Sequence, residues 1–241
     1  MDTIRKALWL ARLEMIVSRK HYLNLVLITG IYTFFFQLTM PAYLEENIFV
    51  FDVFLIIYLM TITFSTKPKG FQYQKMNDEL YASPYAVMLN QLPIRRNVLV
   101  LSRFILPYFA IFASIPTALT ATYIFSPELQ DAIGPLQLIS LIVIWVCFSF
   151  SLGGIFPASE PGDEIKRFTF VWSFASIIIF FVSLYLIFQV WLDTGFFKWT
   201  IYLANEYTIL SIIVSILTAS VVTWYWYHHA LKQIQKIDYL Q

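Results

Sequence analysis

Residues 65–103 read STKPKGFQYQKMNDELYASPYAVMLNQLPIRRNVLVLSR. This is the only long polar break in a chain otherwise made of membrane-length apolar runs, and it carries six of the sixteen lysines and arginines. Its first part, residues 75–82, has a helix-prone composition. A second short helix is indicated after it, because Ser83 suits an N-cap and Pro84 suits the first helical position. Pro93 ends that helix, and a new apolar span follows.

The composition indicates a membrane protein. Of the 241 residues, 59% are apolar and only 13% are charged, whereas soluble domains carry about 25% charged residues. Runs long enough to cross a bilayer as helices recur along the chain. We therefore expect an all-α membrane protein in which residues 1–241 form a single transmembrane domain. The expected six spans are residues 23–43, 47–64, 104–125, 136–156, 168–192 and 207–227.

Two further segments have membrane-surface character. In residues 2–22, Arg5, Arg12 and Arg19 recur every seven residues beside an apolar stripe that includes Leu8. This pattern is typical of a helix in the headgroup layer, and a tail helix without lipid contact is the alternative. Residues 193–206 are too apolar for an ordinary loop and too short to span, so we expect a re-entrant or interfacial piece.

The basic residues set the expected orientation. With six spans and a cytoplasmic N-terminus, all lysines and arginines except Lys198 fall on the cytoplasmic side. Short loops rich in lysine and arginine stay inside. We therefore expect a multi-pass protein of the cell membrane with both termini cytoplasmic.

Within the polar break, the sequence LPIRRNVLVLSRF, residues 92–104, resembles a segment of the type-2 ABC transporter permeases. In that family such a turn follows a cytoplasmic coupling helix and leads into the third span. The span layout extends the resemblance to the whole chain as a pattern. The resemblance implies an N-terminal elbow helix at residues 2–22 and a coupling helix between spans 2 and 3.

The same resemblance implies a function. The chain would be the permease subunit of an ATP-driven exporter, paired with a second permease subunit in a homo- or heterodimer and with two copies of a separate ABC ATPase. The cargo expected is amphipathic or lipophilic: an antimicrobial or toxin-like peptide, a lipid or a drug. The expected ATPase contacts are Asp78, Glu79, Tyr81, Tyr85, Met88 and Leu89, followed by the turn residues Leu92, Pro93, Arg95 and Arg96. The 158–167 loop is expected to be a minor second contact.

An unbroken helix would place three of these contacts on one face. Tyr81, Tyr85 and Met88 are spaced at i, i+4 and i+7, which is the spacing of one helical face. Pro84 complicates this prediction, because a proline at this position can start a fresh helix.

The chain lacks the motifs of an enzyme. No glycine-rich loop ending in Gly-Lys-Ser/Thr is present, so ATP and magnesium are expected in the partner ATPase and no cofactor in this chain. The spans contain no arrangement of histidines or carboxylates suited to catalysis or metal binding. We therefore expect no catalytic, cofactor or metal residues and no nucleic-acid partner. A single cysteine, Cys147, excludes a disulfide framework.

Two charges lie in or beside the spans. Asp52 is five residues into span 2, where it either lines a pathway or reaches headgroup water. Arg103, at the inner end of span 3, is interpreted as snorkelling to lipid phosphate. An ion-coupled secondary transporter and a non-transporting immunity or scaffold subunit remain alternatives to the exporter.

Overall fold

The computed structural model describes residues 2–76, 80–164 and 167–236. These residues are almost entirely helical, which agrees with an all-α membrane protein. The elements, in chain order, are α1 (Asp2–Val17), α2 (Arg19–Glu46), α3 (Phe49–Ser65), η1 (Lys69–Phe71), β1 (Gln74–Lys75), β2 (Leu80–Ala82), α4 (Pro84–Asn90), α5 (Arg96–Phe125), α6 (Pro127–Ala132), α7 (Pro135–Gly153), α8 (Ile155–Ser159), β3 (Asp163–Glu164), α9 (Arg167–Leu184), the π-helix η2 (Tyr185–Trp191), α10 (Phe196–Glu206) and α11 (Thr208–Lys236).

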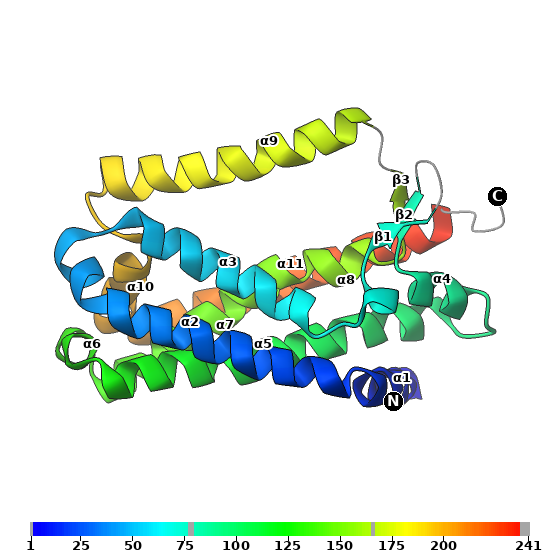
Figure 1. The fold of residues 1–241 in the computed structure, drawn as a ribbon, viewed down its shortest axis with the longest axis horizontal. Helices are drawn as coiled ribbons and strands as arrows, with labels where there is room; N and C mark the ends of the chain where they lie inside the picture. Colours follow the sequence, from blue (N-terminus) through cyan, green and yellow to red (C-terminus); the bar gives the residue numbers. More distant parts are fainter. Residues whose placement is uncertain (1, 77–79, 165–166, 237–241) are drawn as a thin grey trace.

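The long helices run side by side along one axis (Figure 1), with α5 packed against α1, α2, α3 and α7. Within the described residues, five helical stretches are long and apolar enough to cross a bilayer: Arg19–Glu46, Arg96–Phe125, Pro135–Ser159, Phe168–Trp191 and Thr208–Lys236. They indicate a multi-pass membrane protein. The expected second span corresponds to α3, which is apolar but has 17 residues. At 1.5 Å per residue α3 is about 26 Å long, slightly shorter than a hydrocarbon core of about 30 Å.

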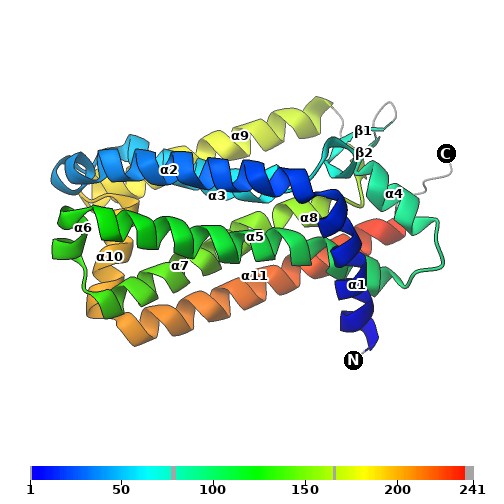
Figure 2. The same cartoon turned by 60° about the horizontal axis from the view of Figure 1, so that its bottom comes forward.

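One long helix stands apart from the others. Figures 1 and 2 both show α9 running separately from the helices beneath it. No residue in its most apolar window is buried, whereas two thirds of the corresponding window of α5 is buried. The helix α9 therefore exposes apolar side chains on all sides.

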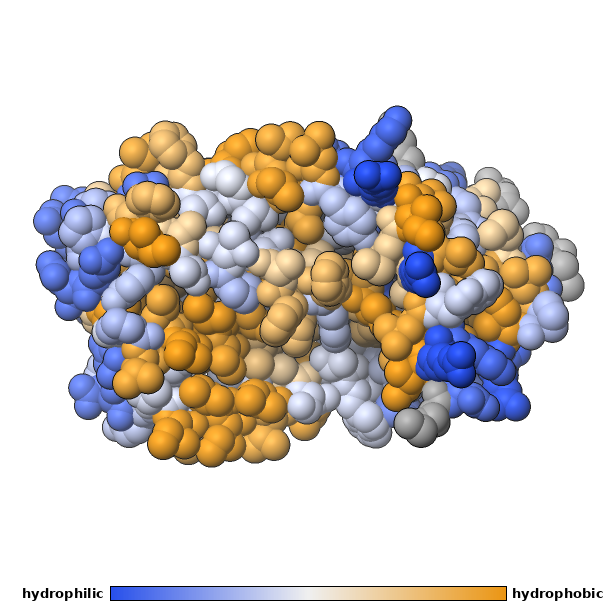
Figure 3. Space-filling model, turned by 90° about the horizontal axis from the view of Figure 1, so that it is seen from below, coloured by the Kyte–Doolittle hydropathy of each residue, from blue (hydrophilic) through white to orange (hydrophobic). Residues whose placement is uncertain are grey.

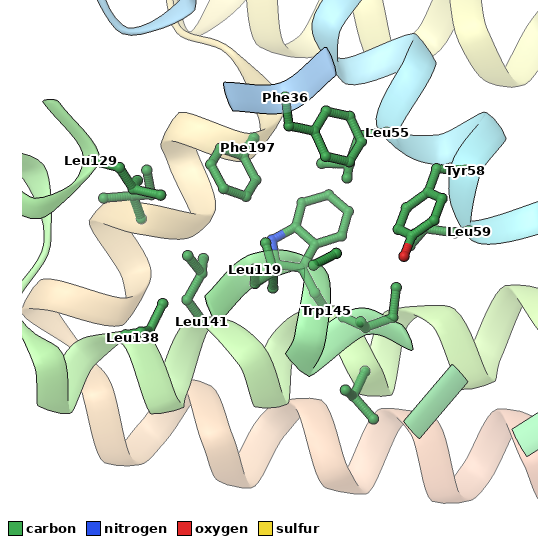
Figure 4. Close-up of a cluster of buried hydrophobic side chains, with 14 of the residues drawn as sticks. Phe36, Leu55, Tyr58, Leu59, Leu119, Leu129, Leu138, Leu141, Trp145 and Phe197 are labelled. Atoms are coloured by element: carbon green, nitrogen blue, oxygen red, sulfur yellow. The ribbon is translucent and has the colours of Figure 1, made fainter. Parts of the chain in front are cut away.

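The core of the bundle is centred on Trp145 of α7. Figure 4 shows its indole among Phe36 of α2, Leu55 of α3 and Phe197 of α10. The indole Nε1 donates a hydrogen bond of 3.0 Å to Thr200 Oγ1, so this buried donor is satisfied.

Gly153 and Gly154 allow close contacts between helices. A Cβ at Gly153 would lie 2.9 Å from Ile111 Cδ1, and one at Gly154 would lie 2.7 Å from Trp226 Cδ1. The helix breaks at Gly154, and Pro157 lies inside the short helix α8.

The two ends of the bundle differ. We call the end that holds α1, α4, the strands and the C-terminal part of α11 the basic end, and the end that holds α6 and α10 the opposite end (Figure 1). Figure 3 shows a mainly apolar band between polar ends, with the most hydrophilic side chains gathered at the basic end. In Figure 2, α1 runs at a steep angle to α2 and crosses the basic end. At the other end, α10 runs across the long helices, so the apolar residues 196–206 form a transverse helix.

The helix expected over residues 75–82 is not present. The described parts of that segment form β1 and β2, which pair antiparallel, and β2 also pairs antiparallel with β3 from the 158–167 loop. The strand order is β1-β2-β3. Local composition favoured a helix, but pairing with a strand more than eighty residues away in sequence overrides a weak local propensity.

Candidate functional site

The two polar loops expected on the cytoplasmic side form one structural body at the basic end. We call this body the cap: η1, β1, β2, α4 and the following residues 91–96 from the first loop, with β3 from the second. Pairing of Leu80 with Glu164 and of Tyr81 with Asp163 joins the two loops along β2 and β3. The second loop is therefore a structural part of the cap.

Ser83 lies at the junction of the cap. Its backbone N–H donates to the carbonyl of Glu160 at 3.0 Å, and its hydroxyl donates to the carbonyl of Phe71 at 3.0 Å. Ser83 occupies the predicted N-cap position before Pro84, but its side chain makes no capping bond. The hydroxyl instead ties α4 to the segment that leaves α3.

Beneath the cap lies a cluster of four buried charges, which we call the charge cluster. Arg103 Nη2 of α5 lies 2.7 Å from Glu14 Oε2 of α1, and its Nη1 lies 3.9 Å from Glu160 Oε2 after α8. Lys67, two residues after α3, pairs with Glu160 Oε1. These four side chains are no more than 6% exposed. The interpretation that Arg103 snorkels to lipid phosphate is wrong, because protein carboxylates surround its guanidinium.

Two carboxylates and two cations make the charge cluster formally neutral. Removing a charge from water is costly unless a partner compensates it, and here each charge has one. Burial raises the pKa of the Glu160 carboxyl, while the charges of Lys67 and Arg103 oppose that rise. The cluster thus connects α1, α5 and the segments that follow α3 and α8.

Helix α4 is fixed to this cluster by its inward face. The guanidinium carbon of Arg103 lies 4.8 Å from the ring centroid of Tyr85, a cation–π contact. The Tyr85 ring also packs against Phe71, with the ring centroids 4.2 Å apart. Leu89 is buried in an apolar cluster with Leu10 of α1 and Ile234 of α11. Leu89 is buried and Tyr85 is half-buried, so both side chains help to hold α4 in place.

The structure separates the other expected contacts. Tyr81 lies in β2, so the helical face shared by Tyr81, Tyr85 and Met88 is wrong; Pro84 starts a new helix after it. Met88 is 50% exposed and Leu92 is 47% exposed. Pro93, Arg95 and Arg96 are exposed beside them. The outer surface of the cap therefore combines apolar side chains with two arginines. Asp78 and Glu79 lie outside the described residues.

Asp52 has a structural environment that neither expectation anticipated. It is buried at the opposite end, where its carboxylate accepts hydrogen bonds from the backbone N–H of Phe196 at 2.8 Å and of Phe197 at 2.9 Å. The hydroxyl of Tyr43 donates a third bond, of 2.9 Å. Asp52 thus binds the N-terminus of α10, where free N–H groups favour an anion. The interpretation that it reaches headgroup water is wrong.

Sequence reasoning did not identify Glu14, Lys67 and Glu160 as site residues. Glu14 carried a signal, since it follows Ala7 and Leu10 at i+7 and i+4 and so lies on the buried face of α1, away from the arginine stripe. Lys67 and Glu160 lie 93 residues apart in polar loops. Nothing local distinguishes them from solvated loop charges.

No protein-family model, curated protein or solved structure matches this chain. In the described part of the chain, no group of three or more histidine, cysteine, aspartate or glutamate side chains is arranged to hold a metal ion. At the basic end, the cap contacts several helices through the charge cluster, Tyr85 and Leu89.

Proposed function

We propose that this chain is the permease subunit of an ATP-driven exporter of the type-2 ABC kind, and that its cap is the docking point for a separate ATPase subunit. The observation that carries the proposal is the charge cluster, because it links the cap to the helices that would have to move. The resemblance of residues 92–104 supports the same assignment.

The contacts of the cap indicate how a force from the docked ATPase would reach the membrane helices. A push on α4 reaches α5 through Tyr85 and Arg103, and reaches α1 and α11 through Leu89. A push on β3 or Ser83 reaches the end of α3 through Glu160 and Lys67. Close-packed protein interiors have low compressibility and transmit strain, so a displacement of the buried Leu89 would be passed to the helices that it contacts.

The proposal includes a topology. The helix α3 acts as the second span and brings the number of spans to six, since small mismatches between helix length and bilayer thickness are tolerated. The helix α1 acts as the elbow helix: Ala7, Leu10 and Glu14 face α5, while Trp9 and Arg12 are exposed. The basic end, including both termini, faces the cytoplasm, because lysine and arginine accumulate on that side.

Pairing with a second permease subunit forms part of the proposal. The isolated helix α9 supports it, because a helix that is exposed on all sides leaves room for a partner helix. Two caps would then present two docking points, one for each ATPase subunit. The cargo expected is amphipathic or lipophilic.

The test is capture of an ATPase by the full-length chain from its native membrane. We expect a co-purifying subunit that carries a Gly-x-x-x-x-Gly-Lys-Ser/Thr phosphate loop and hydrolyses ATP, at equal stoichiometry. Met88→Ala combined with Leu92→Ala removes the two most exposed large apolar side chains of the cap, so this variant should lose the ATPase while its membrane level stays normal. Interface anchors of this kind cost about 1–3 kcal/mol each when truncated.

Leu136→Ala is the matched control, since Leu136 is 73% exposed at the opposite end. It should keep the ATPase. Retention of the ATPase by the Met88/Leu92 double variant would remove the cap from the proposed interface. Proton- or sodium-dependent transport without an ATPase would favour a secondary transporter. Cysteines at Glu46 and Gln235 test the orientation: an impermeant thiol reagent added outside should label only the first.

A further inference from the structure

A groove opens on the surface of the bundle between α7, α10 and α11. It has a volume of about 480 Å³, which lies in the range of small-molecule sites, about 300–1,000 Å³. Its walls include Phe148 of α7, Trp199 of α10 and Val214 of α11. Because α10 crosses the opposite end of the bundle (Figure 2), the groove begins near that end and follows α11 away from it.

The direction and length of the groove suit a hydrocarbon chain. Along α11 the lining residues extend from Ser211 to Thr218, which is about 10 Å of helix at 1.5 Å per residue. The groove therefore runs parallel to the spans, as lipid chains do. Its lining residues include no charged side chain, and its only polar side chains are hydroxyls, the indoles of Trp145 and Trp199 and the thiol of Cys147. An occupant must be apolar along this length.

The end of the groove next to α10 has a different character. Glu206 is exposed three residues after the lining residue Leu203. The opposite end also carries five other exposed carboxylates, those of Glu45, Glu46, Glu128, Asp131 and Asp193. The one lysine there, Lys198, donates its amine to the Leu44 carbonyl and to Asn47 Oδ1. An anionic headgroup is therefore disfavoured, and a cation is favoured by Glu206 and by the face of Trp199.

We propose that this groove binds a cationic amphiphile. The apolar tail lies along α7 and α11, and the positive head lies beside Trp199 and Glu206. Binding depends only on the groove, whereas the statement that such amphiphiles are the exported cargo rests on the proposed function.

The single cysteine of the chain reports on the site. Cys147 lines the groove and is 8% exposed. The purified full chain is placed in nanodiscs of zwitterionic lipid without any ATPase, and a lipid-soluble maleimide is added. Alkylation of Cys147 is followed by intact mass. Tetradecyltrimethylammonium should slow the labelling several-fold, and tetradecyl sulfate at the same mole fraction should not.

Matched variants separate binding from bilayer effects. Ser215→Phe fills the groove and should abolish the protection of Cys147, whereas Ser220→Phe, on the same helix but not lining the groove, should preserve it. Glu206→Gln should reduce the preference for the cationic amphiphile, and Glu128→Gln on α6 should not. Cys147→Ser with Ile178→Cys places the reporter on exposed α9, where neither amphiphile should protect it.

Equal protection by both amphiphiles would overturn the proposal, because an ordinary bilayer lipid would then occupy the groove. Protection of Cys147 that depends on the protein concentration and not on the amphiphile would also overturn the proposal, because a second copy of the chain would then cover the groove. Selective protection in a chain that captures no ATPase would leave the binding site standing while the proposed function fails. ATPase capture without selective protection would contradict only the site.

Discussion

The guanidinium of Arg103 lies 2.7 Å from the carboxylate of Glu14, and protein encloses both side chains almost completely. This pair joins the N-terminal helix to the centre of the bundle. We predict that Arg103→Met destabilises the protein by about 3–5 kcal/mol, because it leaves a buried carboxylate without its partner. Unfolding in detergent measures the effect. Arg12→Met is the control, because Arg12 is exposed on the same helix as Glu14. This substitution should change the free energy of unfolding by less than about 0.5 kcal/mol.

A second substitution should reverse most of this loss. In the double variant Glu14→Met and Arg103→Met, both members of the pair become apolar, and Lys67 remains paired with Glu160. Replacing a whole buried ion pair by apolar residues is often neutral or stabilising. We expect the double variant to be more stable than Arg103→Met alone. A double variant as unstable as the sum of its parts would show that the pair itself is not the source of the effect.

The pKa of Glu160 predicts a pH dependence. Burial raises this pKa in the folded protein above its value of about 4.3 in an unfolded chain. The folded state therefore binds the proton more tightly, and the stability contributed by Glu160 is greatest in acid. It is lost as pH rises through the raised pKa. The unfolding free energy of the wild type minus that of Glu160→Gln should fall across that window. A rise with pH would mean that Lys67 and Arg103 outweigh burial.

The sequence predicted the features that depend on local pattern. The long apolar runs form long helices, and Pro84 is the first residue of α4, as predicted. Whether six spans cross the bilayer remains a prediction, as do the ATPase partner and the orientation. Composition and hydrophobic periodicity are enough to predict helices, because each helix satisfies the hydrogen bonds of its own backbone.

The sequence could not predict features that join distant segments. The strand β2 pairs with β3, and Lys67 pairs with Glu160. The partner of Arg103 is also distant in the sequence. The position of Arg103 at a span end indicated a lipid contact, but Glu14, which lies 89 residues earlier, occupies the space beside it. Tyr85 was expected at the ATPase interface, and its half-buried ring in addition packs against Phe71 and the Arg103 guanidinium, contacts that the sequence did not indicate.

The backbone at Gly195 is enclosed by Tyr43. A Cβ added there would lie 2.0 Å from the Tyr43 hydroxyl oxygen, so alanine displaces the tyrosine that donates to Asp52. We predict that Gly195→Ala destabilises the protein by about 1–3 kcal/mol, as overpacking does. Gly30→Ala is the matched control, since no atom lies within 4 Å of a Cβ at that position. Alanine in a helix is favoured over glycine by about 0.5–1 kcal/mol, so Gly30→Ala should be neutral or stabilising. Thermal unfolding of both variants tests the pair.

Asp52 gives the last prediction, because its hydrogen bonds give it a role in the fold. Its two carboxylate oxygens accept from Phe196 N–H and Phe197 N–H and thereby fix the start of α10. In Asp52→Asn one of these oxygens becomes an amide that cannot accept. Hydrogen bonds to a charged group are worth about 1.5–3 kcal/mol, so we expect a loss of that order in unfolding free energy.

Asp193→Asn is the control for that substitution. Asp193 is exposed nearby with φ of 49°, a conformation that asparagine also tolerates. This variant should be as stable as the wild type. If Asp52 only holds α10, any loss of transport in Asp52→Asn should scale with the loss of folded protein, and the folded fraction should transport normally. If Asp52→Asn is as stable as the wild type but does not transport, Asp52 would instead belong to the pathway. Its carboxylate would then be needed for transport and not for folding.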